Sequence, residues 1–181
     1  FTAFDGLATT LWRTNGSSYE EVTRANGWSL YNPSELSVVT NGTSTEVFLK
    51  ATLSAPPGST DLRLWRNDGT ADGTSKVNWF DGHDWNEVGD TAELTASGAV
   101  LFFRFHTDQW GSELWRADGD IASQVRDIAP RLNANSDPTN LTDIGGVLYF
   151  AADNGDIGRE LWRSDGTEQN TIPVMDIHPD G

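Results

Sequence analysis

Residues 159–167 read Arg159-Glu160-Leu161-Trp162-Arg163-Ser164-Asp165-Gly166-Thr167, and versions of this stretch recur three more times in the 181 residues. The other copies, from the closest to the most divergent, are Glu113-Leu114-Trp115-Arg116-Ala117-Asp118-Gly119, Arg63-Leu64-Trp65-Arg66-Asn67-Asp68-Gly69-Thr70 and Thr10-Leu11-Trp12-Arg13-Thr14-Asn15-Gly16-Ser17. Their leucines follow one another at intervals of 53, 50 and 47 residues. Self-similarity at such a period is typical of repeat architectures.

The last repeat predicts four short strands joined by turns. Residues 138–144 form the first strand, Gly145-Gly146 has the composition of a hairpin turn, and the apolar residues 147–152 form the second strand. Residues 159–164 and 171–177 form the third and fourth strands, on either side of the Asp-Gly turn. Four antiparallel strands in about 45 residues are the length and order of one β-propeller blade.

The earlier repeats fit the same pattern with small insertions and deletions. The sequence therefore predicts an all-β, β-propeller-like fold, with four-stranded antiparallel blades of about 47–53 residues. One repeat domain spans 1–181, with a partial blade at 1–31 and further blades at 32–87, 88–134 and 135–181. Because the first blade lacks its first strand, about 3.75 blades are present. An open propeller leaves strand edges unpaired, so we favour a fragment of a larger propeller over a four-bladed ring.

Composition excludes several classes of partner. The formal charge is −15, which disfavours binding to nucleic acid or to an anionic membrane, whereas divalent metals and neutral sugars stay open. The longest apolar runs are too short to cross a bilayer, so we expect no membrane insertion. The chain has no cysteine, which excludes a disulfide framework and a thiolate zinc site and fits a bacterial exported protein.

The repeated residues are explained by structure alone. On a strand, the Leu and Arg of each copy point to one face and the Trp to the other, so that the Trp fills the space between neighbouring blades. The Asp of each Asp-Gly turn accepts backbone N–H groups, and the Gly supplies a positive φ. We assign structural roles to Trp12, Trp65, Trp115, Trp162, Asp68, Asp118 and Asp165.

These residues resemble the ELWxxDGT repeat family, whose full motif is present at 160–167. The flanking pattern of the family is matched by Asp72-Gly73-Thr74, Asp127-Ile128-Ala129-Pro130 and Leu148-Tyr149-Phe150. The resemblance spans essentially the whole chain, although Thr10 and Arg63 replace the motif's Glu. It implies a propeller-like fold and a secreted or cell-surface location, and it implies no catalytic residues.

Four tryptophans lie outside the repeated motif, in or beside connections: Trp28, Trp79, Trp85 and Trp110. Exposed aromatic rings on loops suit the flat face of a sugar or a partner protein, so these four are candidate contact residues. In the alternative interpretation they cover the junctions between blades.

Two loops carry potential metal ligands. Asp153 and Asp156 with Glu160 offer oxygen ligands around a glycine turn, as a calcium loop would, and the alternative is an Asx turn without metal. The loop around His83 matches no known zinc-ligand spacing, so we interpret it as a solvated loop.

Three Asn-x-Ser/Thr sequons begin at Asn15, Asn41 and Asn140 and are candidate glycosylation sites. So many Asn, Ser and Thr residues would produce about two such motifs by chance.

No nucleophile elbow, phosphate-binding glycine loop or zinc-protease motif is present, and we predict that the chain is not an enzyme. The leading hypothesis is a non-enzymatic extracellular or cell-surface structural or adhesive repeat module. Its partners would be further repeats of the same polypeptide or neighbouring subunits. The alternatives are a propeller lectin that binds glycans through loop tryptophans, and a propeller enzyme whose site is completed by other blades.

Overall fold

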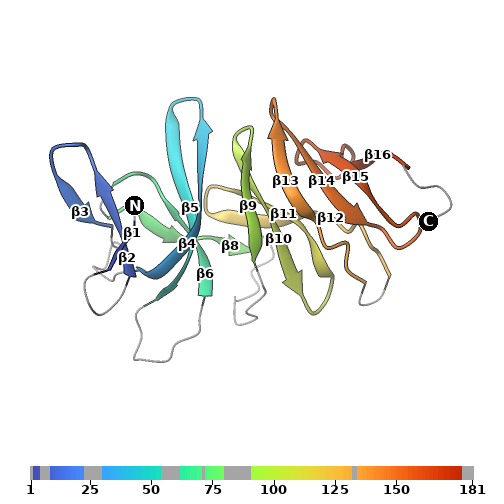
Figure 1. The fold of residues 1–181 in the computed structure, drawn as a ribbon, viewed down its shortest axis with the longest axis horizontal. Helices are drawn as coiled ribbons and strands as arrows, with labels where there is room; N and C mark the ends of the chain where they lie inside the picture. Colours follow the sequence, from blue (N-terminus) through green and yellow to red (C-terminus); the bar gives the residue numbers. More distant parts are fainter. Residues whose placement is uncertain are drawn as a thin grey trace.

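The computed structural model describes residues 2–4, 9–22, 30–53, 62–70, 72–79, 91–131 and 134–176. These residues form β-strands and connecting turns, which confirms the all-β prediction. Among them, no helix has the length and apolar character that crossing a membrane requires. Three sheets follow one another along the chain (Figure 1).

The first sheet is curled and contains the first two repeats. Its strands are β1 (Thr2–Phe4), β2 (Thr9–Thr14), β3 (Tyr19–Glu21), β4 (Leu30–Asn41), β5 (Ser44–Leu53), β6 (Leu62–Asn67) and β7 (Thr74–Lys76). They lie in the order β1-β2-β4-β5-β6-β7, and β3 pairs with β2 on the same side as β4. We call β1–β3 unit 1 and β4–β7 unit 2.

The other two sheets each contain one repeat. Unit 3 consists of β9 (Ala92–Ser97), β10 (Val100–Thr107), β11 (Gly111–Asp118) and β12 (Ile121–Arg126), and unit 4 of β13 (Thr139–Ile144), β14 (Val147–Asp153), β15 (Arg159–Ser164) and β16 (Ile172–Met175). Both are antiparallel, with their strands in chain order. The short β8 (Asn78–Trp79) leaves unit 2 and pairs in parallel with β12, where the amide of Asn78 donates to the carbonyl of Asp120 (2.7 Å).

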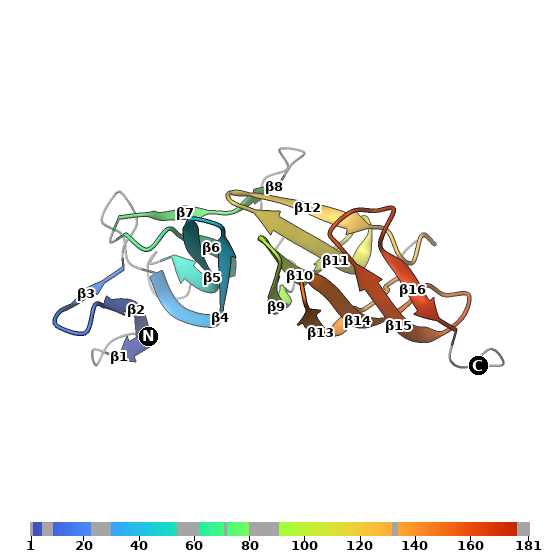
Figure 2. The same ribbon diagram turned by 90° about the horizontal axis from the view of Figure 1, so that it is seen from above.

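The units are stacked in sequence order, from the N-terminus at one end of the long axis to the C-terminus at the other (Figures 1 and 2). The residues described therefore form an open array and not a closed ring. The first strand of unit 3, β9, lies beside the first strands of both unit 2 and unit 4.

The first two repeats differ from the separate blades expected there, a partial one and a four-stranded one, because β4 joins them into one sheet. The three residues of β3 leave part of the edge of β2 open, and Tyr31 at the start of β4 pairs with Thr10 of β2. Two register shifts follow in β4, near Asn32 (φ 51°) and Glu35 (φ 48°). Bulges of this kind bend a strand and increase its twist, which explains the curl of the sheet.

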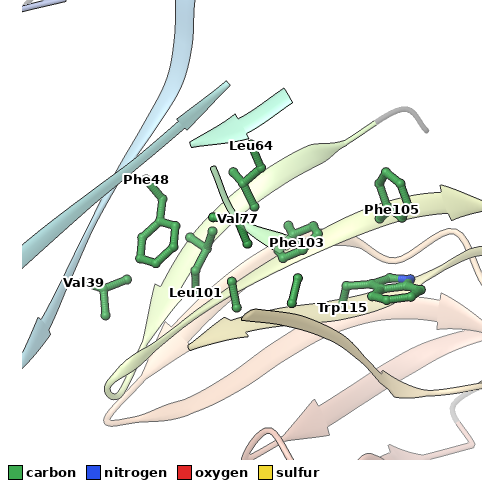
Figure 3. Close-up of a cluster of buried hydrophobic side chains, with 10 residues drawn as sticks. Val39, Phe48, Leu64, Val77, Leu101, Phe103, Phe105 and Trp115 are labelled. Carbon is green, nitrogen blue, oxygen red and sulfur yellow. The ribbon is translucent and has the colours of Figure 1, made fainter. Parts of the chain in front are cut away.

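The hydrophobic core is divided into three layers, each between two successive units. The layer between units 2 and 3 contains Phe48 and Leu64 on one side and Phe103 and Trp115 on the other (Figure 3). A second layer joins units 3 and 4, and a third joins units 1 and 2. Each core layer is thus shared between two successive units.

Candidate functional site

The repeated tryptophan lies on the face of its unit that contacts the preceding unit, which we call the rear face. Trp65, Trp115 and Trp162 are at most 5% exposed and belong to the three core layers. The indole N–H of Trp65 donates to the carbonyl of Ala51 (3.0 Å), and Trp162 makes the equivalent bond to Ala152 (3.1 Å). Trp12 is half-buried in unit 1.

The opposite, forward face of each unit carries the repeated leucine and a valine from the fourth strand. Leu64 of unit 2 and Leu114 of unit 3 are fully buried against the next unit. Val22, Val77 and Val125 occupy one position and are all buried. This valine was not predicted from the sequence, although its recurrence one strand after each leucine is a signal that alignment of the repeats would reveal.

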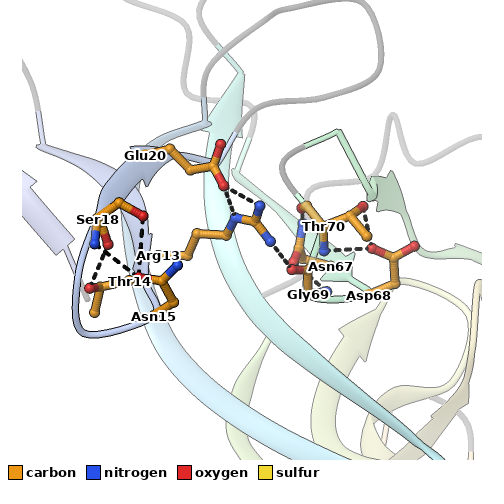
Figure 4. Close-up of polar contacts among 9 residues, drawn as sticks. All are labelled: Arg13, Thr14, Asn15, Ser18, Glu20, Asn67, Asp68, Gly69 and Thr70. Carbon is orange, nitrogen blue, oxygen red and sulfur yellow. Dashed lines mark hydrogen bonds and ion pairs between the residues drawn. The ribbon is translucent and has the colours of Figure 1, made fainter.

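Three of the four repeated arginines connect successive units. Arg13 of unit 1 donates to the carbonyl of Gly69 in the Asp-Gly turn of unit 2 (Figure 4). Arg116 of unit 3 donates to the carbonyl of Gly166 in the turn of unit 4 (3.1 Å). Arg66 of unit 2 instead donates to a carboxylate of the next turn, that of Asp120 (2.8 Å). Three arginines therefore bind the turn of the following unit.

The Asp-Gly turns are Asx turns closed by the following threonine. Asp68 accepts hydrogen bonds from the amide (2.9 Å) and hydroxyl (2.7 Å) of Thr70, and Asp165 accepts the same pair from Thr167. These bonds lower the pKa of both aspartates, with the threonine hydroxyl as the largest cause. In unit 3 Asp120 replaces the threonine and accepts from Arg66 and Ser75 of unit 2. Copy-specific substitutions have therefore changed one inter-unit contact.

Glu113 is the most strongly perturbed acid among the described residues. Its side chain is completely buried and accepts hydrogen bonds from the amide of Ile128 (2.9 Å) and from the amide (3.1 Å) and hydroxyl (2.7 Å) of Ser136. Burial raises the pKa of Glu113 to about 7, against the opposing effect of these bonds. The glutamate therefore ties its strand to the connection between units 3 and 4.

We predict that Glu113→Gln removes a pH dependence of stability. The folded state holds the Glu113 proton up to a pH of about 7, whereas an unperturbed glutamate loses it near 4.5. The free energy of unfolding should therefore fall as the pH rises through this window, by at most about 3 kcal/mol. Urea denaturation at a series of pH values should show this fall in the unchanged chain and not in Glu113→Gln. The exposed Glu168→Gln is the control, and a variant that retained the fall would contradict the assignment.

Of the four loop tryptophans, the structure describes the side chain of one, Trp110. Trp110 is half-buried, packs against the layer between units 2 and 3, and lies 6.2 Å from Trp115 between ring centroids. This packing matches the alternative interpretation, in which the tryptophan covers a junction between blades. Trp79 is in β8, and Trp28 and Trp85, like the loop around His83, lie outside the described residues.

Two aspartates of the candidate calcium loop are engaged, Asp153 in a turn and Asp156 in an ion pair. Asp153 accepts the amide of Gly155 (2.7 Å), Asp156 pairs with Arg131, and Glu160 is buried. In the part of the chain that the structure describes, no three His, Cys, Asp or Glu side chains are arranged to hold a metal ion. These contacts match the Asx-turn alternative, and calcium binding stays a prediction, testable as a rise in Tm on adding calcium.

The three sequon asparagines are exposed. Asn15 accepts the amides of Ser17 and Ser18 (2.9 Å each), Asn41 precedes the turn between β4 and β5, and Asn140 occupies a bulge in β13 with φ 57°. Glycosylation at these sites stays a prediction.

Comparison of the chain with protein-family models, with curated proteins and with solved structures finds no match. The resemblance to the ELWxxDGT repeat family therefore stays a prediction from the sequence.

Proposed function

We propose that this chain is a non-enzymatic structural module that mediates protein–protein assembly outside the cell or at its surface. The observation that carries the proposal is that the repeated residues make contacts between units. The motif tryptophans of units 2–4 and the motif leucines and arginines of units 1–3 contact neighbouring units, so the most regular feature of the sequence serves association between units. A ligand site repeated in every unit would instead present its residues to solvent.

We further propose that the units are successive blades of a propeller-like array. Units 3 and 4 each contain four antiparallel strands in chain order, and the first strands of units 2, 3 and 4 lie next to one another. In a propeller, the first strands converge on the axis. Further repeats or neighbouring subunits would continue the array.

The extracellular location rests on the family resemblance and on the lack of cysteine. The lectin and enzyme alternatives would need a cluster of exposed aromatic or acidic side chains. Trp110, the one loop tryptophan whose side chain is described, packs against a core layer instead.

A tagged form in the native host would test the proposed function. We expect it in the surface or secreted fraction, crosslinked into complexes larger than 19.8 kDa. A glycan array with the purified chain tests the lectin alternative. Retention inside the cell as a monomer would contradict the proposal, and glycan binding lost in Trp110→Ala would replace it with the lectin.

A further inference from the structure

The forward face of unit 4 has the composition of a buried interface, but none of the units that the structure describes covers it. Leu161 is 38% exposed, whereas Leu64 and Leu114 at the same position are completely buried. Val174 is 45% exposed, whereas Val125 is 6% exposed. Tyr149 of unit 4, which pairs with Arg163 as Phe102 pairs with Arg116, belongs to the same uncovered face.

The rear face of unit 1 is uncovered in the same way. Thr14 and Tyr19 are a cross-strand pair next to Trp12, and both are exposed, Tyr19 to 75%. In the other units, the residues at these two positions are at most 6% exposed: Asn67, Thr74, Ala117, Ala122, Ser164 and Thr171. The ring of Tyr19 lies 5.9 Å from that of Trp12, between centroids. An exposed tyrosine packed on a half-buried tryptophan thus stands where every other unit is buried by its neighbour.

The two uncovered faces are the two halves of one interface, which occurs three times inside the molecule. We propose that the forward face of unit 4 binds the rear face of unit 1 of a second copy of this chain, so that copies associate head to tail. The proposal rests on the proposed assembly function and names the partner and the surface. The apolar residues of the two faces would repeat the packing of Leu114 and Val125 against Trp162.

The contact between units 3 and 4 shows how the new interface would form. The turn glycine Gly166 lies directly on Arg116 and Phe102, since a Cβ atom there would be 3.2 Å from each side chain. On unit 4 the corresponding place is a hollow of about 240 Å³ beside Arg163, Val147 and Asp165.

Arg163 is exposed, and among the described residues no turn of a following unit lies against it. The turn of unit 1 supplies the missing acceptor. Gly16 is exposed and has φ 89°, close to the 88° of Gly69 and the 91° of Gly166. Its carbonyl would accept the guanidinium of Arg163 from the other copy, as Gly166 accepts that of Arg116.

Sedimentation velocity of the full chain and two end variants tests the proposal. The unchanged chain should form dimers or longer species as its concentration rises. Leu161→Glu damages only the forward face and Tyr19→Glu only the rear face, so each variant alone should be monomeric, with association weakened at least tenfold. An equimolar mixture should form a one-to-one dimer and nothing larger, because only one intact pair of faces is available. Val38→Glu, the same kind of change at a strand residue 55% exposed on neither end face, is the control and should associate normally.

A cysteine pair provides an independent measurement, because the chain has no cysteine of its own. A short bismaleimide should join Arg163→Cys to Ser17→Cys in a mixture, and should join neither variant to itself. An unchanged chain that stays monomeric, a single end variant that still dimerises, or crosslinking of Arg163→Cys to itself would each overturn the proposal. These results would not remove the assembly function, which depends on the complexes formed in the native host.

Discussion

Replacing Trp162 by alanine should lower the free energy of unfolding by about 3–5 kcal/mol, the range for a large aromatic residue removed from a core. Trp162 is 2% exposed between units 3 and 4, where it stacks near Phe150 at 6.5 Å between ring centroids. The truncation would leave a cavity in the only layer that holds unit 4 to the rest of the described chain. It would also leave the carbonyl of Ala152 without its indole donor.

Trp12→Ala is the matched control, because it makes the same change at the same position of the repeat. Trp12 is half-buried, so we expect a loss of less than about 1.5 kcal/mol. Urea denaturation followed by far-ultraviolet circular dichroism measures both variants without relying on tryptophan fluorescence. Equal losses in the two variants would show that burial between units is not the source of the tryptophan's contribution.

Gly111→Ala should be the second strongly destabilising change, with a loss of up to about 5 kcal/mol. Gly111 begins β11 with φ 69°, a conformation that costs an L-residue about 1–2 kcal/mol. A Cβ atom there would stand 2.0 Å from the carbonyl oxygen of Ala134, in the connection between units 3 and 4. Because that atom belongs to the backbone, the connection itself would have to move, which adds about 1–3 kcal/mol.

Gly119→Ala separates these two costs. Gly119 has φ 58°, and nothing lies within 4 Å of its Cβ position, so only the conformational cost of about 1–2 kcal/mol should appear. The difference between the two variants in chemical denaturation measures the close approach of the connection to β11. If both lost the same free energy of unfolding, that close approach would be refuted.

The strands of the last repeat could be predicted because local turn chemistry defines them. Gly145-Gly146 forms the expected turn, and the third strand begins and ends at the residues predicted, 159 and 164. The joining of the first two repeats could not be predicted in this way, since it depends on one pairing between Thr10 and Tyr31. Two of the bulges in the first strands have positive φ at Glu35 and Glu93, and glutamate, unlike Asn32 and Asn140 in the same kind of position, gives no sequence signal for that conformation.

The faces on which the repeated side chains lie could be predicted from the sequence, because strand alternation places Leu161 and Arg163 on one face and Trp162 on the other. The exposure of these side chains could not be predicted, because it depends on which unit packs against each face. Leu114 and Leu161 share one motif, yet one is completely buried and the other 38% exposed. Trp110 shows the same limit: its place in a connection is evident from the sequence, but its packing against a core layer depends on a contact between units.

The division of the core into layers between neighbours has a consequence for cooperativity. In such a one-dimensional array, stability is the sum of unit terms and nearest-neighbour terms, so a unit at either end has one coupling and an inner unit has two. Units 1 and 4 should therefore open in sub-global fluctuations while units 2 and 3 remain folded, and their amides should exchange with solvent first. The chain would then unfold from its ends inward, and any protein that covers an end face would slow that fraying by adding the missing coupling.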